Sequence, residues 1–407
     1  MRNLLIPTLL GLASLTAVQV QAQTTDQDFM TLDKGRYLAI VGDCVACHTK
    51  PGGLPFAGGL EMQTPFGIIV SPNITPDLET GIGRWSEDDF VKTMQHGVAP
   101  GGKRLYPAFP YPYYTLTSKA DLSAIWAYLN TLESVNNRVE SNQLPFPFNI
   151  RTSLIGWNIL SFRSGEFKSR PDKTEEWNRG AYLVDGLGHC GACHTPKTLW
   201  GGDKSAKLEG GVLLGWTAPN ITAADKQGLG LWTVDDIAAY LKTGTNRLSI
   251  ASGPMKEVIE NSTSKMSDQD LKAIGVYLKD VAGAPDLTKP LAEADAKVRV
   301  GKAIYQDNCA SCHTFSGQGI AELFPPLKGS SVVQQKHADT LIRITLEGTK
   351  GSVTDARPTG PAMPPFGWRL NDDQVAAVLT YIRNSCGNAS PEVSTSSVRA
   401  ARADMQP

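Results

Sequence analysis

Three short segments of the chain carry two cysteines and a histidine in one fixed order. Two residues separate the cysteines and the histidine follows directly, which gives the pattern C-x-x-C-H. The segments comprise Cys44, Cys47 and His48; Cys190, Cys193 and His194; and Cys309, Cys312 and His313. Two thiols one helical turn apart can bond to the two vinyl groups on one edge of a porphyrin, and the histidine can then ligate the iron. The spacing therefore predicts three covalently attached haem c groups.

Other uses of paired cysteines suit this chain less well. A single C-x-x-C could be a redox dithiol or half of a zinc site. Here each pair lies far from the others and each C-x-x-C-H is followed by a threonine. A zinc site would require two pairs to converge. The seventh cysteine, Cys386, has no partner left, and we expect a free thiol without a function.

Each C-x-x-C-H segment lies in a repeat of similar organisation. A glycine opens a short helix before each segment, and these glycines are Gly35, Gly180 and Gly301. The motif Pro-Asn-Ile-Thr follows the first two segments at 72–75 and 219–222. A helix with an N-terminal capping signal comes next, at about 88–95 and 235–242, and a glycine ends it. Apolar residues spaced three and four apart then mark a closing helix, which begins at Ser118, Ser267 or Asn371.

This organisation predicts an all-α protein with three tandem cytochrome c-type helical domains, each around one covalent haem, with irregular linkers. Small domains of this kind gain much of their apolar burial from the porphyrin. We place the domains at 30–135, 173–283 and 293–388, the linkers at 136–172 and 284–292, and a polar tail at 389–407.

A six-coordinate electron-transfer haem needs a second axial ligand, commonly methionine. Met255 and Met363 precede the closing helices of the second and third repeats and are the predicted ligands there. In the first repeat this position holds Phe109, which cannot ligate iron. The sequence leaves that ligand undecided among an open position and three candidates, which are Met62, Met94 and His96.

The start and the charge of the chain bear on where it functions. Residues 1–22 have a basic start, an apolar stretch shorter than a membrane span and small residues before a cleavage point, as in a secretory signal peptide. This predicts export to the periplasm. The formal net charge of −1 over 407 residues gives no reason to expect nucleic-acid binding.

Together with three further motifs, these features resemble the triheme cytochrome c subunit of bacterial membrane-associated dehydrogenases. The motifs are PNITPDLETGIG at 72–83, LYPAFPY at 105–111 and WNRGAYLV at 177–184. The resemblance spans about 32–388. It implies a separate catalytic subunit for alcohols, aldehydes, gluconate or sugars, of flavin, pyrroloquinoline quinone or molybdenum type. It also implies ubiquinone or another cytochrome as acceptor, and peripheral association with the outer face of the inner membrane. Many family members have methionine where this chain has Phe109.

Two functions remain open at this point. The first is an electron relay that is not an enzyme on its own, because the chain has no glycine-rich nucleotide motif between a strand and a helix. The second is a haem enzyme of peroxidase type with an open first haem, which is suggested by Phe109 and the nearby His96.

Overall fold

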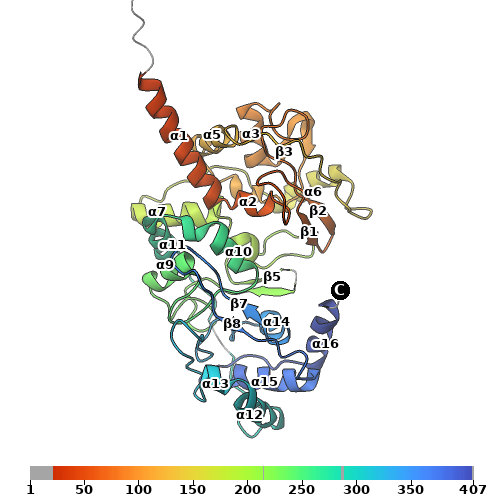
Figure 1. Ribbon diagram of the computed structural model, residues 1–407, viewed down its shortest axis with the longest axis vertical. Helices are drawn as coiled ribbons and strands as arrows, with labels where there is room; N and C mark the ends of the chain where they lie inside the picture. The colour runs from red at the N-terminus through yellow and green to blue at the C-terminus, as the bar shows by residue number, and fades with distance from the viewer. Residues whose placement is uncertain (1–21, 214, 286–287, 406–407) are drawn as a thin grey trace, which may run out of the picture.

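The computed structural model describes residues 22–213, 215–285 and 288–405. The expected signal peptide lies outside the described residues except for Ala22. The molecule is elongated, and the chain follows its long axis from the N-terminal helix at one end to the third repeat at the other (Figure 1). Among the described helices, none combines the length and hydrophobicity needed to cross a bilayer.

Helices dominate all three repeats. The first contains α1 (Ala22–Val41), α2 (Cys44–Cys47), α3 (Glu87–His96), α4 (Tyr111–Tyr114) and α5 (Lys119–Leu129). The second contains α7 (Glu175–Tyr182), a π-helical turn η3 (Leu183–Leu187), α8 (Gly191–His194), α9 (Val234–Thr243), α10 (Pro254–Asn261), η4 (Thr263–Lys265) and α11 (Asp268–Asp280). The third contains α12 (Ala296–Asn308), α13 (Ala310–His313), α14 (Asp339–Glu347) and α15 (Asp372–Asn384).

The fold is mostly helical but not purely so. Four antiparallel two-stranded sheets occur in the described residues: β1 (Glu61–Thr64) with β2 (Gly67–Val70), β3 (Val98–Ala99) with β4 (Lys103–Arg104), β5 (Gly211–Leu213) with β6 (Trp216–Ala218), and β7 (Thr349–Lys350) with β8 (Ala362–Met363). A short helical turn η1 (Pro100–Gly102) joins β3 to β4. The all-α expectation is therefore corrected: loops expected to be irregular close into hairpins, where their backbone groups find partners.

The middle helices begin and end as their sequences predict. Ser86 caps α3 and forms a capping box with Asp89, and Gly97 ends the helix in the left-handed conformation. Thr233 and Asp236 form the same capping box at α9, which ends at Gly244. Side-chain acceptors satisfy the free amides of the first turn, and glycine adopts the left-handed conformation without strain.

The glycine that recurs before each C-x-x-C-H segment lies inside its helix rather than at the start. Gly35 is in α1 where this helix crosses α5, and a Cβ there would lie 1.9 Å from the carbonyl oxygen of Ala124. Gly180 stands in the same relation to Ala273, also at 1.9 Å. The residue is glycine because the two helix backbones approach too closely for any side chain.

The buried side chains of the described residues form two hydrophobic cores, not three. One buried cluster combines side chains of the first and second repeats, such as Leu38 and Ile125 with Leu183 and Leu271. The third repeat has its own cluster, centred on α15. The first two repeats therefore form one packed body, because their helices α1, α4 and α10 meet residues of the neighbouring repeat.

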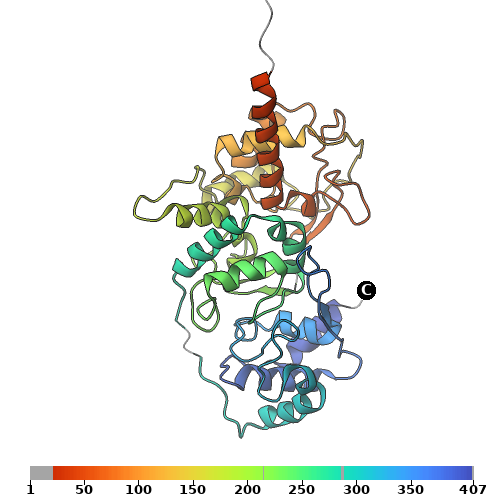
Figure 2. The same ribbon diagram turned by 60° about the vertical axis from the view of Figure 1, so that its left-hand side comes forward.

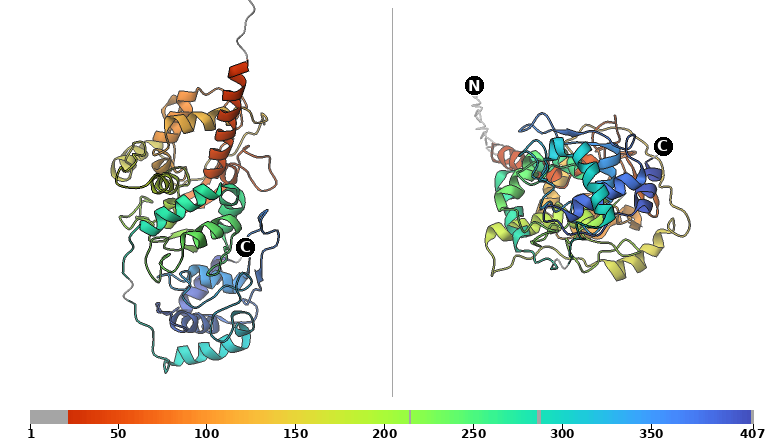
Figure 3. Two further views of the ribbon diagram at one scale, coloured as in Figure 1. Left: turned by 90° about the vertical axis from the view of Figure 1, so that its left-hand side faces the viewer. Right: turned by 90° about the horizontal axis from the view of Figure 1, so that it is seen from below.

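The segments between repeats differ in character. Residues 136–172 contain η2 (Arg151–Ser153) and α6 (Leu154–Ser161). The second connection is expected at 284–292, and its described residues on either side of 286–287 lie on the outside of the molecule (Figure 2). The turned views show that the third repeat continues the long axis of the other two (Figure 3).

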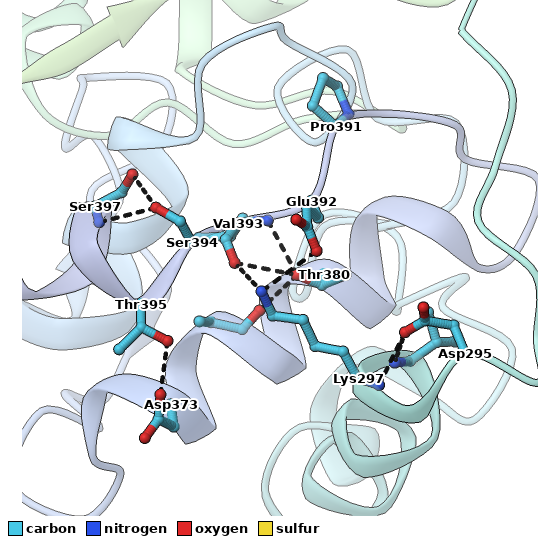
Figure 4. Close-up of polar contacts among 12 residues, drawn as sticks. Asp295, Lys297, Asp373, Thr380, Pro391, Glu392, Val393, Ser394, Thr395 and Ser397 are labelled. Carbon is cyan, nitrogen blue, oxygen red and sulfur yellow. Dashed lines mark hydrogen bonds and ion pairs between the residues drawn. The ribbon is translucent and has the colours of Figure 1, made fainter.

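Residues 389–405, expected as part of a polar tail at 389–407, pack on the third repeat. They include α16 (Thr395–Asp404), which begins at the N-cap Ser394. Figure 4 shows Lys297 donating to the carbonyl oxygen of Val393 at 2.6 Å and Thr395 donating to Asp373 at 2.6 Å. Val398 is fully buried in the core of this repeat. Val393 and Val398 therefore help to hold a segment in which most residues are polar.

Candidate haem-binding sites

The three C-x-x-C-H segments each form a single helical turn. These turns are α2 (Cys44–Cys47), α8 (Gly191–His194) and α13 (Ala310–His313). One turn places the two cysteines of a pair on the same side. All seven cysteines of the chain, Cys386 included, are unpaired in the structure. The six thiols of the pairs are therefore free to form thioether bonds, as covalent haem attachment requires.

Each histidine of these segments is held in the same way. Its Nδ1 bonds to the backbone carbonyl oxygen of a proline: His48 with Pro72 at 2.8 Å, His194 with Pro219 at 2.7 Å, and His313 with Pro325 at 3.0 Å. A carbonyl can only accept, so Nδ1 carries the proton and Nε2 keeps a free lone pair. This hydrogen bond fixes the orientation of the ring and leaves Nε2 available to a metal.

Burial favours the neutral form of these imidazoles. It lowers the pKa of His48, His194 and His313, although the proline carbonyl partly opposes this shift. A neutral imidazole with one committed nitrogen is the form that ligates iron. His48, His194 and His313 share both the bonded Nδ1 and the lowered pKa, and both features suit ligation of a haem iron.

The Pro-Asn-Ile-Thr motif explains two of the three carbonyl contacts. Asn73 and Asn220 are buried, and each accepts a backbone hydrogen bond from the threonine two residues later, at 3.0 and 2.8 Å. This Asx turn fixes the peptide that follows the proline. The repeat was visible in the sequence, but its role in orienting the histidine was not inferred from it.

The cysteine environment differs from that of a redox dithiol. Burial raises the pKa of Cys44 and Cys190 to about 12 and that of Cys309 to about 11. Catalytic dithiols have a lowered pKa, because the thiolate is the nucleophile. The zinc alternative also has no support, since no cluster of three or more metal-binding side chains occurs in the described residues.

The first and second segments lie next to each other. Helix α10 of the second repeat contacts α2 of the first. Burial, followed by the charges of Asp43 and Cys193, raises the pKa of Cys47 to about 11. Between the two segments, the ring of Tyr114 lies 5.5 Å from that of His189, the residue before Cys190. The first and second C-x-x-C-H segments therefore lie at one interface.

Two tyrosines clamp this interface reciprocally. Tyr37 of the first repeat donates to Asp270 of the second at 2.6 Å. Tyr182 of the second repeat donates to Asp121 of the first at 2.5 Å. Tyr37 lies two residues after Gly35, and Tyr182 lies two residues after Gly180. Each repeat thus offers the same donor and the same acceptor to the other, as in a two-fold interface.

The start of each closing helix completes the clamp. The amide of Ser267 donates to the hydroxyl of Tyr37 at 3.2 Å, and the amide of Ser118 donates to that of Tyr182 at 3.2 Å. Lys34 forms an ion pair with Asp121 at 2.6 Å. Arg179 contacts Asp270 through two hydrogen bonds, at 2.7 and 2.8 Å. The relative position of the first two repeats is therefore fixed by part-buried polar contacts to two buried aspartates, Asp121 and Asp270.

The second and third repeats meet at strand β6 and helix α14. The amide of Thr217 donates to the hydroxyl of Thr340 at 2.8 Å, and this hydroxyl donates to the carbonyl oxygen of Thr217 at 3.0 Å. The amide of Asn220 donates to Gln335 at 3.1 Å. Asn220 follows Pro219, so the loop that orients His194 also docks on the third repeat.

The predicted methionine ligands and the undecided candidates lie in different surroundings. Met255 is in the first turn of α10 and Met363 is in β8, and both are half-buried. Of the candidates for the first repeat, Met94 is buried in the shared core, His96 is exposed at the end of α3, and Met62 is half-buried in β1.

This arrangement defines a c-type cytochrome. The family model described as cytochrome c matches residues 298–385. The chain is 39% identical over 394 residues to the gluconate 2-dehydrogenase cytochrome c subunit of Pantoea cypripedii, covering 91% of this chain and 89% of that protein. It is 37% identical to the cytochrome c subunit of alcohol dehydrogenase (quinone) of Komagataeibacter europaeus, covering 93% and 85%. The fructose dehydrogenase cytochrome subunit of Gluconobacter japonicus is 36% identical, with 96% and 87% covered.

The chain therefore belongs to the family of cytochrome c subunits of dehydrogenase complexes. It is a haem c protein that transfers electrons and is not the catalytic subunit. None of these relatives is named as a peroxidase, so the peroxidase alternative gains no support from them.

Proposed function

We propose that the chain carries three haem c groups and relays electrons from a catalytic dehydrogenase subunit to ubiquinone or to another cytochrome. The observation that carries this proposal is the threefold occurrence of one arrangement: two free thiols on a helical turn, and a histidine whose Nδ1 is bonded to a proline carbonyl. The domains are those at 30–135, 173–283 and 293–388. In this proposal the first two share one core.

When bound, haem supplies a one-electron centre whose potential depends on its axial ligands and its burial. The chain's own residues attach it, orient it and exclude water. The cysteine pairs would hold the porphyrin through thioether bonds, and His48, His194 and His313 would each ligate iron through Nε2. Met255 and Met363 would supply the second ligand in the second and third domains; both are half-buried thioethers, Met255 in the first turn of α10 and Met363 in β8.

Electrons pass along the chain of domains in order, in one direction or the other. The clamp between the first two domains supports this step, as do the β6–α14 contacts between the second and third. The elongated arrangement supports it as well, because it leaves the first and third domains at opposite ends (Figure 1). One end would face the donor and the other the acceptor.

The protein works in the periplasm in this proposal, exported by residues 1–22 and associated peripherally with the outer face of the inner membrane. The names of the relatives support a partner that oxidises gluconate, an alcohol or a sugar; an aldehyde is a further substrate class that the family resemblance implies. That partner would hold the flavin, pyrroloquinoline quinone or molybdenum at which substrate is oxidised.

The test is to purify the chain with its catalytic partner and to follow haem reduction after each class of substrate is added. We expect one class to reduce all the haem. A His194→Ala variant interrupts the middle of the relay, so only the haem on the donor side should be reduced at the normal rate. Failure of every substrate class to reduce haem in the purified complex would contradict the proposal.

A further inference from the structure

The backbone register shows which residue of the first repeat stands where the second repeat has Met255. The amide of Leu105 donates to the carbonyl oxygen of Gly97 at 2.8 Å, and the amide of Ala251 donates to that of Gly244 at 2.8 Å. Both glycines end the middle helix of their repeat. Four residues after Leu105 comes Phe109, and four residues after Ala251 comes Met255.

The third repeat leads to the same correspondence through its sequence. Met363 lies in Pro-Ala-Met-Pro at 361–364, and Phe109 lies in Pro-Ala-Phe-Pro at 107–110. The two segments differ only in the residue that would ligate iron. A phenyl ring has no lone pair to offer.

Phe109 lies beside the first C-x-x-C-H segment. Its ring contacts that of Tyr114 edge-on, with centroids 5.4 Å apart, and both side chains belong to the core cluster that includes Cys44. The hydroxyl of Tyr114 is directed to the carbonyl oxygen of Gly42 at 3.4 Å, two residues before Cys44, which places Tyr114 next to the first segment. Phe109 therefore forms part of the apolar wall around the first haem position.

The tyrosines of the same loop are engaged elsewhere. Tyr106 donates to the carbonyl oxygen of Phe148 at 2.9 Å, and Tyr111 donates to Asn158 at 2.5 Å. Tyr114 is directed to the carbonyl oxygen of Gly42 at 3.4 Å. Each hydroxyl thus points to a backbone or side-chain oxygen rather than to an open position.

The three candidates for the sixth ligand of the first iron, Met62, Met94 and His96, also lie in places that do not suit this role. Met94 lies three residues before Gly97, and the apolar Leu241 holds the corresponding place in the second repeat, three residues before Gly244. Both side chains pack in the shared core, so Met94 serves as a core residue. His96 is exposed. Met62 lies in the β1–β2 hairpin, which continues into the loop whose Pro72 carbonyl holds His48, so Met62 belongs to the segment that holds the histidine.

We propose that the first domain supplies no sixth ligand, and that the first iron has an open position walled by Phe109 that accepts small neutral ligands such as carbon monoxide or nitric oxide. This rests on the proposed haem attachment at Cys44 and Cys47. An apolar wall without a donor or a charge suits neutral diatomic ligands and disfavours anions.

The test uses the full chain with its haem content established by intact mass. Reduced protein is titrated with carbon monoxide, and binding is followed by absorbance. We expect one haem in three to bind it readily and the other two to remain inert. The spin state, measured by electron paramagnetic resonance of the oxidised protein, should likewise show one haem different from two.

Two variants at one position separate ligation from packing. Phe109→Met should add a thioether ligand and abolish carbon monoxide binding. Phe109→Leu, which is apolar and lacks a donor, should keep it. A wild-type protein with three haem groups and no carbon monoxide binding would overturn this inference while leaving the proposed relay intact.

His189 is the remaining imidazole near this interface, and its Nδ1 contacts the carbonyl oxygen of Leu187 at 3.1 Å. Because it directly precedes Cys190, it lies at a porphyrin edge in our account. His189→Ala should therefore leave carbon monoxide binding unchanged. Binding that arises only in this variant would identify His189 as the sixth ligand and refute the open position.

Discussion

Removing the hydroxyl of Tyr182 should weaken the association of the first two domains. The substitution Tyr182→Phe removes the 2.5 Å hydrogen bond to Asp121 and leaves the amide of Ser118 without its acceptor. Asp121 is 8% exposed and keeps only the ion pair with Lys34. A hydrogen bond to a charged group contributes about 1.5–3 kcal/mol. We therefore expect a loss of about 2–3 kcal/mol, roughly a 30- to 140-fold change in the unfolding equilibrium.

The reciprocal substitution Tyr37→Phe should cost less, about 1–2 kcal/mol, because Asp270 keeps two hydrogen bonds from Arg179. The assay is urea unfolding of the haem-loaded protein, followed by haem absorbance. Two transitions are expected, one for the shared core and one for the third domain. Only the first should move in these variants.

A matched control is Tyr305→Phe, which removes a hydroxyl that donates to the carbonyl oxygen of Thr314 at 2.6 Å within the third domain. It should shift only the second transition. If Tyr182→Phe unfolds within about 0.5 kcal/mol of the unchanged protein, the clamp contributes nothing beyond an ordinary surface contact, and the reasoning is refuted.

Three further results are expected. Gly180→Ala should lower the free energy of unfolding by at least about 1–3 kcal/mol or prevent haem incorporation, because its Cβ would lie 1.9 Å from the carbonyl oxygen of Ala273. The control is Gly156→Ala in α6, where an added Cβ would meet no atom within 4 Å. It should be neutral or slightly stabilising in thermal unfolding. Although burial opposes ionisation of Asp270, hydrogen bonds from Arg179 and Tyr37 hold its pKa below the ordinary value. The contribution of Asp270 to folding stability is therefore complete above about pH 4 and is lost as pH falls through that lowered pKa. Acid unfolding of the Asp270→Asn variant should lack this pH dependence. Val398→Asp buries an unpaired carboxylate and should release α16 to proteolysis while the first transition stays in place; an intact, protected C-terminus would contradict the packed tail.

Local signals made parts of the fold predictable from sequence. The capping residue Ser86 and the terminating Gly97 mark the ends of α3 because each acts within a few residues of its own position. The C-x-x-C-H segments are equally local, since one helical turn contains the whole motif. For the same reason the closing helices appeared in the apolar periodicity.

Features that depend on distant segments could not be derived in this way. Gly35 was interpreted as the start of a helix, whereas its role is the close crossing of α1 and α5, which depends on a helix far along the chain. The proline carbonyls that hold His48 and His194 come from a repeat that was noticed without a role. The polar composition of 389–407 concealed that Val398 packs in the core of the third repeat.

The shared core of the first two domains is the clearest case. Tyr37 and Tyr182 stand two residues after Gly35 and Gly180, so the sequence shows that they correspond. Their partners, Asp270 and Asp121, lie in the opposite repeat. A repeat pattern shows which residues correspond, but it does not show which copies bind each other.

Intact mass of the mature, exported protein tests the central claim most directly. The account predicts the polypeptide from about residue 23 onward with three covalently bound haem groups, and two in a variant with Cys190→Ser and Cys193→Ser. The control Cys386→Ser should retain three. A mature protein that carries fewer than three haem groups under full haem supply would contradict the account.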